Sequence, residues 1–228
     1  MRTRWRSERK AASCIGGMAL ACVAYYILVR RWFNRWGTST EERERRMPGD
    51  DLIASPTSGG MQALTINAPP EDIWPWLMQV GYQRGGLYSF DWLDRLFGFL
   101  DRPSSNGILP QFQHLAVGDE IPWGHGEHLT VAAVDPPRTL VLEYHGRGMD
   151  WVWQFGLYAI DPVNTRLVTR GTEHTPLTLP WRLTMLMMEP AAFVMTTRML
   201  FGLKRRAERL RFAREDDEPG DHRHAVGS

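Results

Sequence analysis

The chain has 228 residues, of which 43% are hydrophobic and 23% charged, so a wholly disordered or collagen-like protein is excluded. The formal net charge of +1 is a cancellation: residues 1–46 carry 11 basic and 4 acidic groups, whereas residues 47–203 carry 9 basic and 16 acidic groups. All basic residues except Lys10 and Lys204 are arginine. This excess runs through the whole chain and marks no single surface, so we expect no nucleic-acid partner.

The basic N-terminal tail, residues 1–10, is followed by an uncharged run at residues 11–29 (AASCIGGMALACVAYYILV). Nineteen helical residues span about 28 Å, close to the ~30 Å hydrocarbon core of a bilayer. The run predicts one transmembrane helix and a single-pass membrane protein. A cleaved signal peptide is the alternative, but the run continues for seven residues beyond Cys22 and ends at Arg30. Basic residues nearly balance on its two sides, so the side of the membrane stays open.

Both cysteines, Cys14 and Cys22, lie in this run. The remainder of the chain therefore has no disulfide, no cysteine-ligated zinc and no cysteine nucleophile. The densest titratable cluster is His125-Gly126-Glu127-His128, whose spacing matches no metal motif. No dinucleotide-binding or nucleophile-elbow motif is present either. We expect no metal and no cofactor.

Residues 30–47 are predicted to form a basic juxtamembrane segment with a short helix near residues 38–46, capped by Thr38 or Ser39. A strand is expected at residues 61–68, where Pro69-Pro70 ends it, and a helix opens at Glu71. A second short helix is expected at residues 88–96. Residues 101–127 are rich in Gly, Pro and Asn, which indicates loops and short strands.

Four further strands are predicted at residues 129–134, 139–145, 151–160 and 166–173. In the third of these, the odd positions from Trp151 to Leu157 are all large and apolar and therefore share one face. A long amphipathic helix is expected to start at Glu189-Pro190 and to run to about Ala213. Residues 214–228 are predicted to be a disordered polar tail.

This order of elements predicts an α+β domain over residues 48–213, with helices segregated to one face of the sheet. A curved antiparallel sheet around a long C-terminal helix leaves room between them for an apolar ligand. The domain is preceded by the one transmembrane helix.

Three stretches resemble a known family. Residues 66–77 (INAPPEDIWPWL) resemble the opening of SRPBCC proteins, the superfamily of START lipid-transfer domains and polyketide aromatase/cyclases. Residues 82–94 (YQRGGLYSFDWLD) and the helix from EPAAFVM at residues 189–195 to KRRAE at residues 204–208 are similar to a bacterial subgroup. The resemblance covers about residues 36–209 and implies a helix-grip fold with a hydrophobic cavity. The resemblance implies no specific reaction. The predicted N-terminal membrane segment is a difference from the common soluble members of the family.

The leading hypothesis is a membrane-anchored domain that binds a hydrophobic small molecule or lipid. The expected cavity wall comes from the aromatic strand face, the second short helix and the methionine-rich start of the long helix. Its members are Trp92, Trp151, Trp153, Phe155, Met195 and Met199.

Two alternatives stay open. An aromatase/cyclase-like enzyme would act on a polyketide-type substrate with Arg84, Tyr88, His125 or His128 as acid/base groups, which would have to converge in the cavity. A non-catalytic module would instead use the acidic body to recruit a protein to the membrane. For Arg84, a structural ion pair with Asp91 or Asp94 that fastens the two short helices is the favoured interpretation. Ligand identity, protein partners and oligomeric state do not follow from the sequence.

Overall fold

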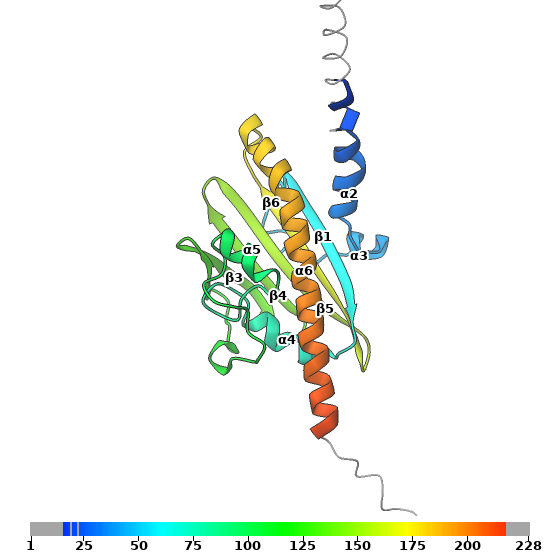
Figure 1. The fold of residues 1–228 in the computed structure, drawn as a ribbon, viewed down its shortest axis with the longest axis vertical. Helices are drawn as coiled ribbons and strands as arrows, with labels where there is room; N and C mark the ends of the chain where they lie inside the picture. Colours follow the sequence, from blue (N-terminus) through cyan, green and yellow to red (C-terminus); the bar gives the residue numbers. More distant parts are fainter. Residues whose placement is uncertain (1–15, 19, 22, 218–228) are drawn as a thin grey trace, which may run out of the picture.

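The computed structural model describes residues 16–18, 20, 21 and 23–217 (Figure 1). The predicted tail at residues 1–10, both cysteines, and residues 11–15 and 19 of the predicted span lie outside the described residues, as do residues 218–228. Within the described part, no helix combines the length and the apolarity that a membrane crossing requires. Near the N-terminus lie the π-helix η1 (Tyr25–Val29) and the α-helices α2 (Arg30–Phe33) and α3 (Thr40–Glu44).

Helix α3 forms where the sequence predicts a short helix, and its cap explains why. The Ser39 hydroxyl accepts a hydrogen bond from the Glu42 amide, and the Glu42 carboxylate accepts one from the Ser39 amide. This capping box satisfies two amides that the first turn leaves free. Glu42 also accepts from Arg166 Nε at 2.6 Å, so the segment before residue 48 is attached to the sheet.

Six antiparallel strands form one sheet with the order β1-β6-β5-β4-β3-β2. The strands are β1 (Ser58–Ile66), β2 (Glu120–Gly124), β3 (Glu127–Asp135), β4 (Thr139–Gly146), β5 (Met149–Asp161) and β6 (Asn164–His174). Strands β3 to β6 follow one another through short turns, which is why they pair with their chain neighbours. Strand β1 pairs with β6 and leaves its other side as an edge of the sheet.

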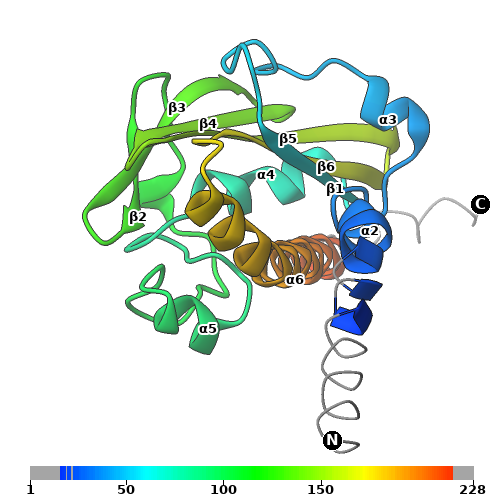
Figure 2. The same ribbon diagram turned by 90° about the horizontal axis from the view of Figure 1, so that it is seen from above.

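The remaining helices are α4 (Pro70–Met78), α5 (Asp91–Leu96), the 3₁₀ turn η2 (Pro110–Phe112) and α6 (Leu179–Asp217). Seen from above, the sheet arches over α6, and α4 lies between the two (Figure 2). The 39 residues of α6 extend for about 58 Å. The predicted α+β class and the helix-grip arrangement, a curved antiparallel sheet around a long C-terminal helix, are confirmed.

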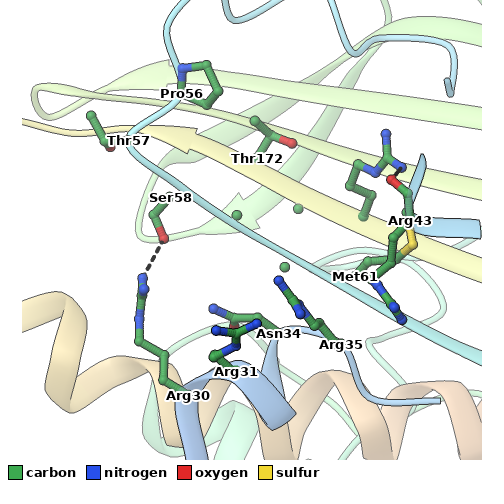
Figure 3. Close-up of a pocket in the computed structure, with 14 residues that line it drawn as sticks. Arg30, Arg31, Asn34, Arg35, Arg43, Pro56, Thr57, Ser58, Met61 and Thr172 are labelled. Atoms are coloured by element: carbon green, nitrogen blue, oxygen red, sulfur yellow. Dashed lines mark hydrogen bonds between the residues drawn. The ribbon is translucent and has the colours of Figure 1, made fainter. Parts of the chain in front are cut away.

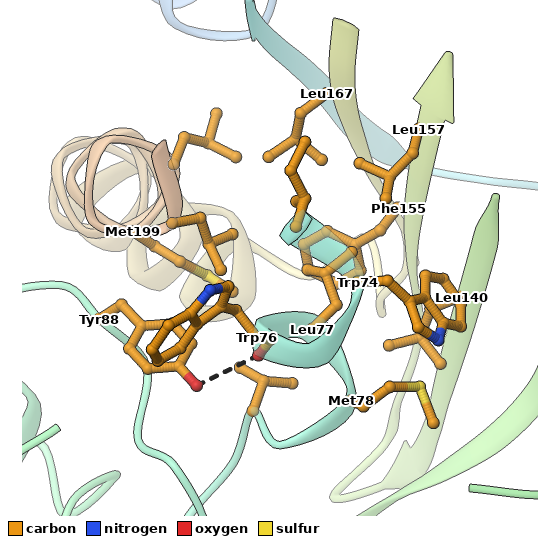
Figure 4. Close-up of a cluster of buried hydrophobic side chains, with 14 of the residues drawn as sticks. Trp74, Trp76, Leu77, Met78, Tyr88, Leu140, Phe155, Leu157, Leu167 and Met199 are labelled. Carbon is orange, nitrogen blue, oxygen red and sulfur yellow. Dashed lines mark hydrogen bonds between the residues drawn. The ribbon is translucent and has the colours of Figure 1, made fainter. Parts of the chain in front are cut away.

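The main core lies between the concave face of the sheet, α4 and α6 (Figure 4). Leu200, Leu203 and Ala207 of α6 are fully buried there, as the spacing of the predicted apolar stripe requires. Strand β5 contributes Phe155 and Leu157 from the apolar face that begins at Trp151. Packing of this one helical stripe against the sheet fixes where α6 crosses.

Two predicted helix boundaries are wrong. The long helix begins at Leu179, so Pro190 lies inside it and costs one backbone hydrogen bond without ending it. Glu189, the residue before Pro190, forms an ion pair with Arg30 of α2, so this turn of the helix is attached to α2. The short helix expected from residue 88 begins at Asp91, since Tyr88 has a φ of 59°, outside the helical region.

Candidate ligand-binding cavity

A cavity of about 390 Å³ lies between α6 and the concave face of the sheet. Strands β1, β2, β5 and β6 line it on the sheet side, and α6 lines it opposite. The end of α5 with the loop after it closes one side, and residues of α2 reach the other. Its volume lies within the usual range for sites that enclose a small molecule.

Aromatic side chains form the sheet side of the cavity. Trp151 and Trp153 of β5 stack with ring centroids 5.3 Å apart, and Trp123 of β2 packs against both at 5.6 and 5.5 Å. The Trp153 indole donates to Thr169 Oγ1 at 2.9 Å. The Trp151 indole has no acceptor among the described residues, so its N–H is available to a polar group of a ligand.

The helical side of the cavity is rich in methionine. Met185, Met188, Met195 and Met199 of α6 all line it, at the three- and four-residue spacing that places side chains on one helix face. Methionine side chains are flexible and polarisable, so they adapt to ligands of irregular shape. Met187 is 80% exposed and lies outside the cavity.

Three carboxyl groups lie in this otherwise apolar lining, those of Asp94, Glu173 and Glu189. The Asp94 side chain at the end of α5 is fully buried, and both of its oxygens lie within hydrogen-bond distance of Ser89 Oγ, at 2.6 and 2.7 Å. Burial raises the pKa of Asp94 to about 6, the Ser89 hydroxyl opposes this rise, and the charge of Asp91 adds to it. Asp94 can therefore donate a proton or hydrogen bond in mildly acidic conditions and accept one above them.

A second polar group of the lining lies toward α2. Glu189 of α6 accepts from Arg30 Nε at 2.8 and 2.9 Å, and Arg30 also reaches Ser58 Oγ at 3.2 Å. Nearby, burial raises the pKa of Glu173, and the negative charge of Glu189 raises it further. Arg30 therefore connects α2 to α6 through the ion pair and to β1 through Ser58, across this end of the cavity.

Four of the six residues expected in the cavity wall line it: Trp151, Trp153, Met195 and Met199. The other two lie elsewhere. Trp92 is 66% exposed on the outer face of α5. Phe155 is fully buried beneath Trp153, at a centroid distance of 4.7 Å, and belongs to the core.

None of the four acid/base candidates lines the cavity. Arg84 donates to the Met78 carbonyl and stacks over the Phe112 ring, and Tyr88 is buried with its hydroxyl donating to the Trp76 carbonyl. His125 is exposed and donates from Nε2 to the Phe97 carbonyl at 2.8 Å, while His128 is exposed on β3. The structure does not bring these side chains together at one point.

The interpretation of Arg84 as the ion-pair partner of Asp91 or Asp94 is wrong. Asp91 accepts from Ser104 at 2.7 Å, and Asp94 accepts from Ser89. Arg84 instead donates to two backbone carbonyls: that of Met78, at the end of α4 where carbonyls lack helical partners, and that of Phe112 in η2.

The carboxylate of the His-Gly-Glu-His cluster is likewise used locally. Glu127 accepts from Arg147 Nε at 2.7 Å and from the Tyr144 hydroxyl at 3.0 Å. In the described part of the chain, no three histidine, cysteine or acidic side chains are grouped as a metal site would require.

Asp94 and Ser89 were considered from the sequence as polar groups near a ligand, and both line the cavity. Several aromatic lining residues did not emerge from the sequence. Phe97 and Phe99 follow α5, and Trp123 lies on a short strand between Pro122 and Gly124. The aromatic residues on both sides of Gly98 could have indicated a buried surface near this loop, because large apolar side chains in a loop need other residues to cover them.

Neither a protein-family model nor a curated protein matches the sequence. Solved structures with similar backbones include a hypothetical protein from Helicobacter pylori, at 10% identity, 71% coverage of this chain, 95% of the other and a TM-score of 0.44. Norcoclaurine synthase from Thalictrum flavum is 12% identical, with coverages of 68% and 96% and a TM-score of 0.39. CalU16 from Micromonospora echinospora is 14% identical, with coverages of 68% and 86% and a TM-score of 0.34. These distant likenesses assign no function, so the case for one depends on the cavity itself.

Proposed function

We propose that the chain is a membrane-anchored domain that binds a hydrophobic small molecule or lipid between its sheet and α6. The observation that carries the proposal is the cavity of about 390 Å³, with tryptophans on one side and methionines on the other. A ligand that buries roughly 300 Å² of apolar surface would gain about 7 kcal/mol. Part of this gain offsets the loss of translational and side-chain freedom on binding.

Polar groups within the cavity would set the orientation of the ligand. The Trp151 N–H is a donor without a partner among the described residues, and Asp94 with Ser89 forms a second polar point. A few convergent polar groups in an apolar lining are typical of small-molecule sites. The acid/base candidates lie outside the cavity, so they add no argument for a reaction there.

Membrane anchoring by residues 11–29 belongs to the same proposal. Its support is the uncharged run with basic flanks, together with the position of the first turns of α6. Leu179, Leu183 and Met187 in the first turns of α6 are 69, 52 and 80% exposed, and these turns lie at the same end of the molecule as α2 (Figure 1). Exposed apolar groups at that end fit contact with a bilayer surface.

Ligand binding can be tested with a cavity-filling variant of the full chain. Ala192 of α6 lines the cavity, whereas Val194 of the same helix is exposed and lies outside it. We expect Ala192→Trp to abolish co-purification of a lipid or hydrophobic molecule, measured by organic extraction and native mass spectrometry, and Val194→Trp to retain it. Wild-type protein that carries no ligand and binds no hydrophobic probe would refute the proposal.

Anchoring is tested separately by fractionation of cells that express the full chain. A spanning segment remains with the membrane after extraction at alkaline pH, and replacement of Ala19 and Val23 by Arg should release the protein, because charged groups at the bilayer centre are costly. Release of the wild-type chain by alkaline extraction would contradict the anchor.

A further inference from the structure

A groove of about 490 Å³ lies beside β1 at the edge of the sheet, next to α2 (Figure 3). Among the described residues, fourteen line it, and the charged members are all arginine. They are Arg30, Arg31, Arg35, Arg43 and Arg170. The chain has nearly equal numbers of acidic and basic residues, but this groove has five guanidinium groups and no carboxylate in its lining. The groove therefore carries a strong local positive charge.

Two of these arginines are neutralised by carboxylates just outside the groove. Arg30 pairs with Glu189, and Arg170 pairs with Asp50 at 2.6 Å. The other three have no ion pair with any carboxylate in the described part of the chain. Arg43 donates to the Thr38 carbonyl and to Thr40 Oγ1, both at 2.9 Å, and the Glu41 carboxylate interacts with it without forming an ion pair.

The edge of β1 also directs one backbone amide toward the groove. The amides of Met61 and Ala63 point outward from the sheet and are taken up by the carbonyls of Asn34 and Trp36. Since donors alternate along a strand, the amide of Gly59 faces the same edge, and Gly59 lines the groove. A backbone amide beside guanidinium groups is a suitable site for the oxygens of an anion.

The groove adjoins the ligand-binding cavity. Five residues line both hollows: Asn34, Ser58, Gly59, Gly60 and Gly171. Gly60 pairs with Gly171, so the paired strands β1 and β6 lie between the two hollows, which meet around the edge of β1 where Arg30 donates to Ser58 Oγ. An amphiphile with an apolar portion in the cavity and a charged end in the groove would pass around this edge, beside Arg30.

We propose that the arginine groove binds the phosphate of a phospholipid-type amphiphile whose apolar portion occupies the cavity. This assignment rests on the proposed function. Arginine binds phosphate through paired N–H donors, and three arginines without an ion pair among the described residues suit a phosphate better than a singly charged carboxylate. The groove begins one residue after the predicted span, at the depth where lipid headgroups lie when that span is inserted.

The test uses the full chain in an uncharged maltoside detergent and two short-chain probes. Dihexanoyl phosphatidic acid carries the phosphate, and dihexanoylglycerol has the same apolar portion without it. We expect the variant with Arg31, Arg35 and Arg43 all changed to Gln to bind the phosphatidic acid on the order of 100-fold more weakly in calorimetry. Its affinity for dihexanoylglycerol should be unchanged.

A matched variant changes Arg95, Arg138 and Arg209 to Gln, which removes the same charge from exposed positions outside both hollows. It should bind both probes like the wild type. Inorganic phosphate in excess should compete with phosphatidic acid and leave dihexanoylglycerol binding unaffected. If inorganic phosphate binds as tightly as phosphatidic acid, the groove is a site for free phosphate, and the proposal that it binds an amphiphile is overturned.

The two proposals fail in different ways. If the wild type binds dihexanoylglycerol and phosphatidic acid equally, or if the groove and matched variants lose the same affinity, the arginine groove is not a phosphate site and the cavity proposal stands. If the wild type binds neither probe, the proposed ligand-binding function itself fails.

Discussion

Asp94 gives the sharpest test of the cavity's electrostatics. Its carboxyl is fully buried, receives one hydroxyl from Ser89 and has no ion pair with a basic residue among those described. Its pKa is raised from 3.8 to about 6, mainly by burial. The folded protein therefore holds this proton up to about pH 6, whereas the unfolded chain releases it near pH 4. The stability associated with the protonated group is present below pH 4 and is lost as the pH rises through about 6.

The magnitude follows from the two values. A difference of about two pH units corresponds to ~3 kcal/mol between the protonation states. Asn has nearly the shape of Asp and does not ionise, so Asp94→Asn should match the wild type at pH 4 and exceed it by about 1–3 kcal/mol at pH 8. Other titrating groups are common to both proteins and cancel in the difference.

The assay is urea unfolding of the full chain in uncharged detergent, followed by tryptophan fluorescence at pH 4, 6 and 8. A stability difference that is the same at every pH, or a variant that is less stable than the wild type at pH 8, would refute the conclusion that burial destabilises the ionised Asp94 carboxylate.

The remaining predictions concern the hydrogen bond to this carboxyl, the attachment of α2 and one close contact of α6. Ser89→Ala should raise the pKa of Asp94 further and cost more stability at pH 8 than at pH 4, since the hydroxyl stabilises the ionised form; equal losses at both pH values would contradict this. Glu189→Gln should remove the carboxylate that pairs with Arg30, cost about 1–2 kcal/mol and speed tryptic cleavage near α2 several-fold, and the double variant with Arg30→Gln should lose less than the sum of the two single variants. Gly202→Ala should lower the melting temperature at a cost of about 1–3 kcal/mol, because a Cβ there overlaps the backbone of the segment before α5, whereas Gly107→Ala, with open space around it, should not.

Much of the fold could be predicted because its signals are local. The strand turns, the cap at Ser39 and the apolar stripe of α6 each depend on residues a few positions apart. The start of α6 was predicted ten residues too late because Pro190 is a strong local signal for a helix start. The ion pair between Arg30 and Glu189, 159 residues apart in the chain, is invisible to such signals.

The sequence predicted a cavity between the sheet and the long helix, but only part of its lining. Trp151, Trp153 and Phe155 share one face of β5, but α6 and α4 cover part of that face and leave the rest open, so Phe155 belongs to the core. Period-two alternation assigns residues to a face and cannot say what covers each of them. Trp92 is a large aromatic residue, as expected in a cavity wall, yet its side chain on α5 is exposed to solvent.

The sequence by itself determined the α+β class, the order of the main strands, the long C-terminal helix and the apolar character of the residues that meet inside. It also revealed the basic head that a net charge of +1 conceals. Only the tertiary structure decided which side chains line a hollow, that Asp94 is buried in the lining of the cavity, and that Arg31 and Arg35 line the same groove as Arg170. The physical reason is that secondary structure follows from neighbours along the chain, whereas a cavity is the space that remains after distant elements have packed.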